Sequence, residues 1–468
     1  YKAWADALGP RIDARFWRED AGQYMSYIGE AAHPVPYAKY DLLATSLGVL
    51  AGVLPTERAR RALAAYPASA VGSPVVWPQE GNQPVYHNRA IWPFVSAYSL
   101  RAARLLDDAP RITGEVQSLM RGAALAGSNM ENYELLSQKI HVHEGALSGP
   151  VVNSERQLWS VAGYLDMVLQ GVFGMETDGR VQPKLPVALV PELFGTRDRI
   201  SLQMEGKRYV LLKPDVLQGE LLVAGKVQRD GDTTTVQLVP AATSPQRVVR
   251  AQRARTAVDA AAYAPATPAA PSAKQDGKAW TIRVPAQHVL WRDGAAVDVH
   301  DGVARMADDG LQHCLSLTYR ENALESLHSP TTCIGPQQRL PGAQRWSWTQ
   351  PAAGRVRVRL QFNNPNGPIN TGVTAAVKQL AVSCAGQPVQ THTMVMPHSV
   401  AVQESTAAEF GLPASACTFQ LQEGFNMSAL HHFAHYTGGK GGRAGVLNTA
   451  DVKALLLAPI APLAGGRP

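Results

Sequence analysis

The chain has 468 residues, 45% hydrophobic and 18% charged, which describes a globular protein of about three domains and excludes a disordered one. Its 44 Lys and Arg residues exceed its 38 Asp and Glu residues by six and are scattered, so no nucleic-acid-binding face is expected. The longest apolar run, 42–54, is too short to cross a bilayer, and no membrane span is expected.

Residues 1 to about 180 have the pattern of paired helices. Apolar helices alternate with amphipathic ones, which predicts an inner and an outer helical layer, as in half of a closed helical toroid. A closed toroid of this kind takes about twelve helices, so we expect an upstream segment or a second chain to close the barrel. The expected helices are 3–17, 38–53, 56–65 with Thr56 as N-cap, 88–106, 110–126, and 154–173 with a capping box from Ser154 to Gln157.

Polar and aromatic residues gather between Trp77 and Trp159, close to the starts of apolar helices. Sugar rings stack on Trp and Tyr, and sugar hydroxyls need amide, imidazole and carboxylate partners. This stretch therefore predicts a carbohydrate site. The expected sugar-binding residues are Trp77, Gln83, Tyr86, His87, Asn88, Trp92, Tyr133, Gln157 and Trp159.

Three glutamates in this stretch are candidates for catalysis. Inverting glycoside hydrolysis needs two carboxyl groups about 6.5–9.5 Å apart, one to protonate the leaving oxygen and one to activate water. Glu131 is the best candidate for the base. The alternative is that Glu131 is a solvent-exposed loop residue with no part in catalysis. Glu134 and Glu80 are the other candidates, with Glu144 as a further spare.

From residue 181 onward, short alternating runs predict antiparallel β-sandwich domains. We expect strands at 199–204, 209–213, 221–227 and 234–238, and a strand that enters a turn at Asp293-Gly294. The predicted domains are the α/α portion at 1–180, a small β domain at 181–255, an Ala/Pro-rich linker or loop at 256–279, a β module at 280–338 and a β-sandwich at 339–468.

The four cysteines, Cys314, Cys333, Cys384 and Cys417, all lie in the C-terminal third. An even set in β-like sequence indicates two disulfides and an oxidising compartment, so we expect a periplasmic or secreted protein. Pairing between sequence neighbours is the local choice, and four buried thiols are the alternative. The start at Tyr1 without Met indicates a processed or truncated chain.

No metal or cofactor is expected. His431-His432-x-x-His435 has metal-like spacing for a helix, but its surroundings are β-like and offer no clear carboxylate partner. Gly438–Gly442 lacks the first glycine and the trailing Ser/Thr of a P-loop, so it indicates a turn.

The helical stretch resembles the six-hairpin glycosidases, the (α/α)6-barrel superfamily that includes trehalases and processing α-glucosidases. The resemblance is carried by Phe16-Trp17 with Gln23-Tyr24, by Tyr86-His87-Asn88 with Trp92-Pro93, and by Met130-Glu131-Asn132-Tyr133. It implies that residues 1–180 form the second half of an (α/α)6 toroid, that Glu131 is the general base, and that the general acid lies upstream of Tyr1. In the β part, 280–329 is similar to a fibronectin type III-like module, and 355–460 to a galactose-binding-like jelly roll.

Three functions remain open, each with a carbohydrate as partner. The first is an inverting glycoside hydrolase acting on a poly- or oligosaccharide, with Glu131 as base. The second is a polysaccharide lyase, in which Asn88 would neutralise a uronate and His87 or Tyr86 would transfer the proton. The third is a non-catalytic glycan-binding protein.

Overall fold

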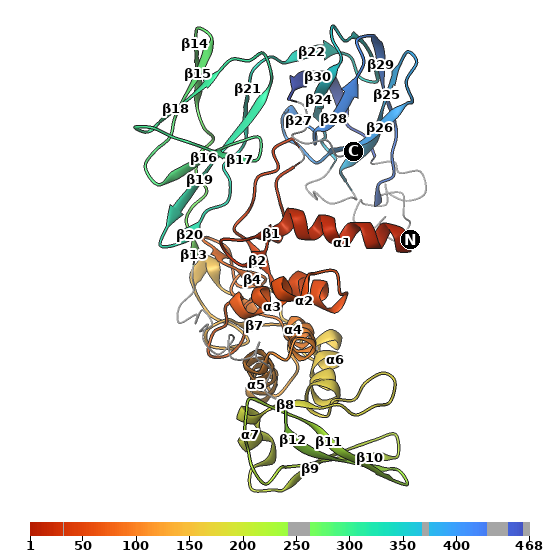
Figure 1. Ribbon diagram of the computed structural model, residues 1–468. Coiled ribbons are helices and arrows are strands. Elements are labelled where there is room, and N and C mark those ends of the chain that lie inside the picture. Colours follow the sequence, from red (N-terminus) through yellow and green to blue (C-terminus); the bar gives the residue numbers. More distant parts are fainter. Residues whose placement is uncertain (31, 242–262, 367–373, 428–447, 462–468) are drawn as a thin grey trace. The chain divides into compact units, whose positions relative to one another are not determined.

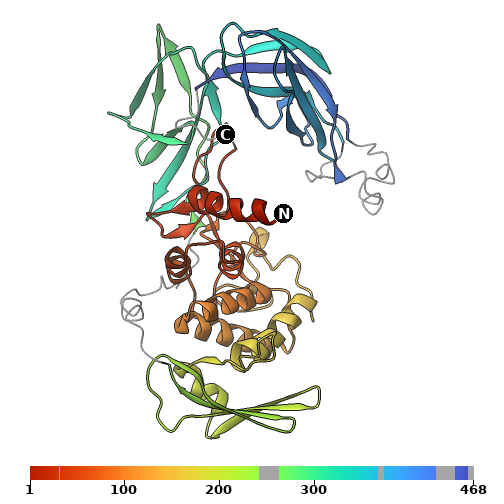
Figure 2. The same cartoon turned by 45° about the vertical axis from the view of Figure 1, so that its right-hand side comes forward.

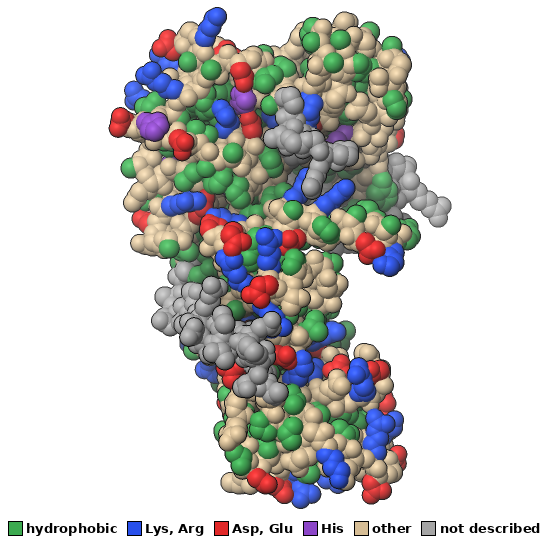
Figure 3. Space-filling view, viewed as in Figure 1, with side chains coloured by type: hydrophobic (Ala, Val, Ile, Leu, Met, Phe, Trp, Pro, Cys, Tyr) green, Lys and Arg blue, Asp and Glu red, His purple; other side chains and the backbone are tan. Residues whose placement is uncertain are grey.

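The computed structural model describes residues 1–30, 32–241, 263–366, 374–427 and 448–461 (Figure 1). The chain divides into two compact units, Tyr1–Tyr27 with Tyr37–Ala266, and Ile28–Pro36 with Thr267–Pro468. None of the helices in the described ranges is long and apolar enough to cross a membrane. Figure 3 shows acidic and basic side chains intermixed on the face that it draws.

The helices of the first unit lie close to the predicted positions. They are α1 (Lys2–Phe16), α2 (Leu42–Leu50), α3 (Thr56–Ala65), α4 (Pro93–Leu105), α5 (Ala109–Ala126), α6 (Leu158–Asp166) and α7 (Val190–Phe194), with short turns η1 (Gly145–Leu147), η2 (Met167–Val172) and η3 (Val187–Leu189). Two predicted caps are wrong. The N-cap of α3 is Pro55, one residue earlier than predicted, and Ser154 lies outside α6 because its backbone is bonded to Glu131 instead.

Helix α4 is the centre of the helical part, and most of its residues are buried. Helices α2, α5 and α6 pack on α4, and α3 packs on α2. Figure 2 shows the α4–α5 pair, in orange, between the α2–α3 pair and a green sheet. In contrast, α6 buries only Ser160 and Gly163. These described helices do not show a half toroid, which stays a prediction.

A five-stranded sheet shares one hydrophobic core with α4 and α5. Leu100 of α4 and Ile112 of α5 belong to the same buried cluster as Leu222 and Val236 of the sheet. Only the β10–β12 pair is parallel. The strand order is β8 (Lys184–Pro186), β11 (Leu221–Asp230), β12 (Thr233–Pro240), β10 (Lys207–Leu212) and β9 (Arg199–Met204). The predicted domain boundaries stay a prediction.

Short strand pairs connect the loops that precede the helices. They are β1 (Trp17–Arg18) with β2 (Gln23–Tyr24), β3 (Tyr40–Asp41) with β4 (Val76–Trp77), β5 (Gln79–Glu80) with β13 (Tyr263–Ala264), and β6 (Ala90–Ile91) with β7 (Tyr133–Glu134). The backbone also joins neighbouring pairs, since Val75 N–H donates to Ala90 C=O at 3.0 Å. The loops before α2, α4 and α6 are thus held together.

The second unit confirms the prediction of antiparallel β-sandwiches. Its first sandwich has one core that includes Ile282 and Leu317, one from each sheet. Asp293 and Gly294 both have positive φ, 49° and 94°, and form the predicted tight turn between β16 and β17. One sheet of this sandwich consists of β14 (Ala273–Asp276), β15 (Ala279–Arg283) and β18 (Val303–Ala307). The other consists of β17 (Ala295–Val297), β16 (His288–Arg292), β19 (His313–Glu321), β20 (Leu324–Glu325) and β21 (Thr332–Ile334).

The second sandwich has a larger core, in which Leu360 and Phe419 come from opposite sheets. Both predicted disulfides are confirmed, and each joins directly paired residues of neighbouring strands, Cys314 with Cys333 and Cys384 with Cys417. One sheet of the second sandwich consists of β22 (Gln338–Pro341), β30 (Asp451–Ile460), β24 (Gly354–Asn363), β27 (Gln403–Glu404) and β28 (Ala408–Leu412). The other consists of β23 (Arg345–Thr349), β29 (Ala416–Glu423), β25 (Ala376–Cys384) and β26 (Gln390–Met396).

The segment Ile28–Pro36 is built into the second unit through two buried histidines. His328 Nε2 faces the Pro36 carbonyl at 2.8 Å, so this nitrogen donates and His328 Nδ1 accepts from the Ser316 hydroxyl, also at 2.8 Å. Ser316 Oγ then accepts from His33 Nε2 at 2.8 Å. Burial lowers the pKa of His33 to about 4, which keeps the His33 ring neutral at physiological pH.

His313 lies between two carboxylates in the first sandwich. Its Nδ1 is 2.5 Å from Asp293 Oδ2, and its Nε2 is 3.1 Å from Asp309 Oδ2. The hydrogen bond with Asp293 is the largest cause that raises the pKa of His313, and Asp309 adds to it. The imidazole, when protonated, links the β16–β17 turn to the loop before β19 by two charge-assisted hydrogen bonds.

We expect His313→Ala to lower the free energy of unfolding by about 1–3 kcal/mol at about pH 5.5, because charge-assisted hydrogen bonds are lost. The folded pKa of His313 lies above the unfolded value, so this stabilisation is complete below the unfolded pKa and is lost as the pH rises through the folded pKa. Urea denaturation of both proteins at about pH 5.5 and about pH 9 measures the effect. A difference that is as large at the higher pH would contradict this account.

Candidate functional site

Glu131 is a buried carboxylate held by two loops. Its side chain accepts a hydrogen bond from the Tyr86 hydroxyl at 2.9 Å and another from Ser154 N–H at 3.1 Å, one on each oxygen. The Glu131 N–H in turn donates to the Ser154 carbonyl at 2.9 Å. A carboxylate oxygen has two acceptor positions, so each oxygen keeps capacity for a water or a ligand hydroxyl.

The Tyr86 hydroxyl is a donor in this arrangement. Burial, and after it the hydrogen bond to Glu131, raises the pKa of Tyr86. The phenol therefore stays protonated near neutral pH and orients the carboxylate. A lyase that used Tyr86 as its base would need a lower pKa, which is the opposite direction.

An aromatic cluster lies beside this carboxylate. The His87 ring stacks on Trp92 at 4.8 Å with an interplanar angle of 8°, and Trp92 Nε1 donates to the Tyr86 carbonyl at 2.9 Å. Trp159 lies 5.3 Å from Phe94 and 6.2 Å from Trp92, ring centre to ring centre. Trp92 is only 5% exposed, whereas Trp159 is 46% exposed and His87 is also exposed. His87 and Trp159 thus offer surfaces to a ligand.

Asn88 shapes the loop that carries this cluster. Its amide oxygen accepts from Glu80 N–H at 2.8 Å, and its amide nitrogen donates to the carbonyls of Glu80 and Gln83 at 3.0 and 3.3 Å. The Asn88 amide is therefore occupied by the backbone. Gln83 is exposed at the loop surface.

The other predicted carboxylates are paired with cations. Glu80 forms an ion pair with the buried Lys39. Glu134 is 2% exposed and accepts from Arg89 Nε at 3.0 Å and from the Ser137 hydroxyl at 2.6 Å. The same Arg89 binds both oxygens of Glu144 at 2.6 and 2.7 Å. These contacts give the three glutamates structural partners, and a catalytic part for Glu80 or Glu134 stays a prediction.

The remaining predicted residues support the loops. Tyr133 is 2% exposed and donates its hydroxyl to the Ser128 carbonyl at 3.2 Å, and Trp77 packs on the same small core. Gln157 precedes α6, and its backbone N–H donates to the Asn129 carbonyl at 3.0 Å. In the part of the chain that the structure describes, no three His, Cys, Asp or Glu are grouped to hold a metal. The histidines at 431, 432 and 435 lie outside that part.

One helix cap of the first unit was not predicted from the sequence. Asp41 precedes α2, and its Oδ1 accepts from Ala44 N–H at 2.7 Å. Burial raises the pKa of Asp41, and the N–H groups of Ala44 and Leu43 oppose that rise. An Asp directly before an apolar helix is the ordinary signal of an N-cap, which gives no indication of a ligand.

No protein-family model and no curated protein matches the chain. Among solved structures, a family 35 carbohydrate-binding module from Cellvibrio japonicus Abf62 is 10% identical with a TM-score of 0.17, covering 39% of this chain and 94% of the module. A family 35 module from Clostridium thermocellum is 12% identical with a TM-score of 0.15, covering 40% and 96%. At these TM-scores neither similarity bears on fold or ligand, and the resemblance to six-hairpin glycosidases stays a prediction.

We expect substitutions of Trp92 and Trp159 by alanine to lower the free energy of unfolding by different amounts. Trp92→Ala removes a buried ring and its hydrogen bond, which costs about 3–5 kcal/mol of unfolding free energy. Trp159→Ala removes a half-exposed ring and costs less than about 1 kcal/mol. Urea denaturation of both variants measures the two values, and equal losses would show that Trp159 is a core residue.

Proposed function

We propose that the first unit binds a carbohydrate over His87 and Trp159 and hydrolyses it by an inverting mechanism, with Glu131 as general base. The observation that supports this most is the buried Glu131 carboxylate, oriented by Tyr86 and Ser154, beside the aromatic cluster that includes the half-exposed Trp159. Carbohydrate sites combine these features because sugar rings have both apolar faces and hydroxyl edges.

In this proposal Glu131 activates a water molecule. The water donates one hydrogen bond to a free lone pair of the carboxylate and attacks the anomeric carbon, and its proton passes to Glu131 as the new C–O bond forms. The bond to the leaving oxygen breaks, and that oxygen takes a proton from a second carboxyl group. The hydrogen bonds from Tyr86 and Ser154 fix the carboxylate so that little reorganisation is needed.

A non-catalytic glycan-binding protein is the second candidate. The observation that favours it is the pairing of Glu80, Glu134 and Glu144 with Lys39 or Arg89, which leaves none of these three as a free acid. Binding over the same aromatic surface would then occur without product. The two disulfides accord with the periplasmic or secreted location proposed for either function.

We expect Glu131→Gln to lower the rate of glycan hydrolysis by about 10²–10⁴-fold while the dissociation constant changes by less than about 10-fold. Glutamine has the same shape: its oxygen can accept from Ser154 N–H, and its amide can donate to the Tyr86 oxygen. Reducing-sugar release and calorimetric titration with an oligosaccharide panel measure the two quantities.

Glu155→Gln is the matched control, because Glu155 is an exposed glutamate of the same loop region. It should behave as wild type in both assays. Hydrolysis by Glu131→Gln at the wild-type rate would remove Glu131 from the reaction. Saturable binding by wild type with no product from any panel member would instead select the glycan-binding function.

A further inference from the structure

The segment that carries the Ser154 N–H is held by hydrogen bonds rather than by burial. Val152, Ser154 and Glu155 are exposed, and Asn153 between them is only half-buried. An exposed segment gains little from apolar burial, so its hydrogen bonds decide where its backbone points. Ser154 binds Glu131 through a backbone N–H, and the direction of this donor therefore depends on what holds the neighbouring residues.

Asn153 makes three hydrogen bonds with one side chain. Its amide oxygen accepts from Asn132 N–H at 3.2 Å, and its amide nitrogen donates to the Asn132 carbonyl at 3.0 Å and to the Ile140 carbonyl at 2.9 Å. The bonds to both backbone groups of Asn132 resemble those between paired residues of a β-ladder, with a side chain in place of a second strand. Asn153 thus joins its own segment to the residue that directly follows Glu131.

The preceding residue of one segment and the following residue of the other form a reciprocal pair. Glu131 N–H donates to the Ser154 carbonyl at 2.9 Å, and Ser154 N–H donates to the Glu131 carboxylate at 3.1 Å. The Asn132–Asn153 bonds are therefore one residue away from this pair on both segments. A shift of the Asn153 backbone would move the peptide N–H that the carboxylate accepts.

We propose that Asn153 is a positioning residue for Glu131, because its amide fixes the Ser154 N–H that orients the carboxylate. This rests on the proposed function of Glu131. A carboxylate that loses its orientation no longer aligns a water with the anomeric carbon, and a misplacement of about 1 Å can cost about 10²-fold in rate. Asn153 acts only through Ser154 and Glu131 and takes no part in proton transfer.

The competing explanation is that Asn153 only adds stability to the first unit. Another bond holds the same segment, since Gln157 N–H donates to the Asn129 carbonyl at 3.0 Å. If that bond suffices, loss of the Asn153 amide lowers the free energy of unfolding and leaves the carboxylate in place. The two explanations differ in how substitutions of Asn153 and Glu131 combine.

The test is a double-mutant cycle on hydrolysis of the panel oligosaccharide that wild type cleaves fastest. Asn153→Leu keeps the branched shape of the side chain and removes all three hydrogen bonds. We expect it to lower kcat by about 10–10²-fold while KM changes by less than about 3-fold. In the Glu131→Gln background it should cost less than about 3-fold, because the carboxylate that Asn153 positions is already gone.

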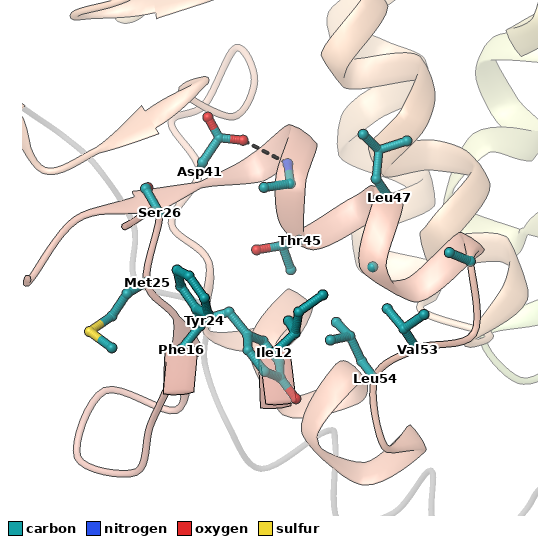
Figure 4. A pocket seen from close by; sticks show the side chains of 13 residues that line it. Ile12, Phe16, Tyr24, Met25, Ser26, Asp41, Thr45, Leu47, Val53 and Leu54 are labelled. Atoms are coloured by element: carbon teal, nitrogen blue, oxygen red, sulfur yellow. Dashed lines mark hydrogen bonds between the residues drawn. The ribbon is translucent and has the colours of Figure 1, made fainter. Parts of the chain in front are cut away.

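Two controls separate positioning from stability. Asn364→Leu is matched in chemistry, because the Asn364 amide also accepts from one backbone N–H, at 3.0 Å, and donates to two carbonyls, at 3.0 and 2.9 Å, in the second sandwich. Leu54→Ala is matched in location, because Leu54 lines a mainly apolar cavity of about 440 Å³ in the first unit, whose lining residues all lie between Ile12 and Leu54 (Figure 4). Both variants should lower the free energy of unfolding and keep the wild-type kcat.

Urea denaturation checks that each variant is folded. Should Asn153→Leu not fold, Asn153→Asp replaces it, since aspartate keeps the acceptor for Asn132 N–H and loses both donors. The same result is expected, a lower kcat in the wild-type background and little further loss beside Glu131→Gln.

The outcomes separate this inference from the proposed function. Equal losses in the two backgrounds, or a wild-type kcat, would overturn the positioning role of Asn153 while leaving Glu131 as base. Full activity of Glu131→Gln would overturn the proposed function itself. A wild type that hydrolyses no member of the panel would overturn both.

Discussion

The candidate site depends on how the buried charge of Glu131 is satisfied. Taking a carboxylate out of water costs several kcal/mol unless hydrogen bonds replace the lost hydration. Here the replacements come from two separate loops, a hydroxyl from Tyr86 before α4 and an N–H from Ser154 before α6. The site can therefore exist only when both loops are correctly placed, and the short strand pairs β3–β4 and β6–β7 supply that placement.

Some side chains near Glu131 hold the loops in place, and others are exposed to a ligand. Arg89 neutralises Glu134 and Glu144, and Lys39 neutralises Glu80, so these charges fix the loops. The Asn88 amide is likewise occupied by backbone groups of the loop. Fewer side chains stay open to a ligand than the sequence suggested, namely the exposed His87 and Trp159 of the aromatic cluster beside Glu131.

Local patterns predicted the local structure well. Strand β9 was predicted with its bounds, the Asp293-Gly294 turn followed from its residue types, and the cysteine pairs followed from their neighbourhood in sequence. The predicted cap at Ser154 was wrong because a distant partner, Glu131, binds its backbone. The supporting parts of Glu80 and Glu134 could not be predicted either, since their cations come from other loops.

A structure of Glu131→Gln bound to an oligosaccharide, selected by calorimetry, would test the central claim most directly. We expect the apolar face of a sugar ring to lie on Trp159. One water molecule should lie between the anomeric carbon and the side chain of residue 131, at about 3 Å from that side chain. A sugar bound only to the β-sandwiches of the second unit, with the surface over Glu131 empty, would contradict the account.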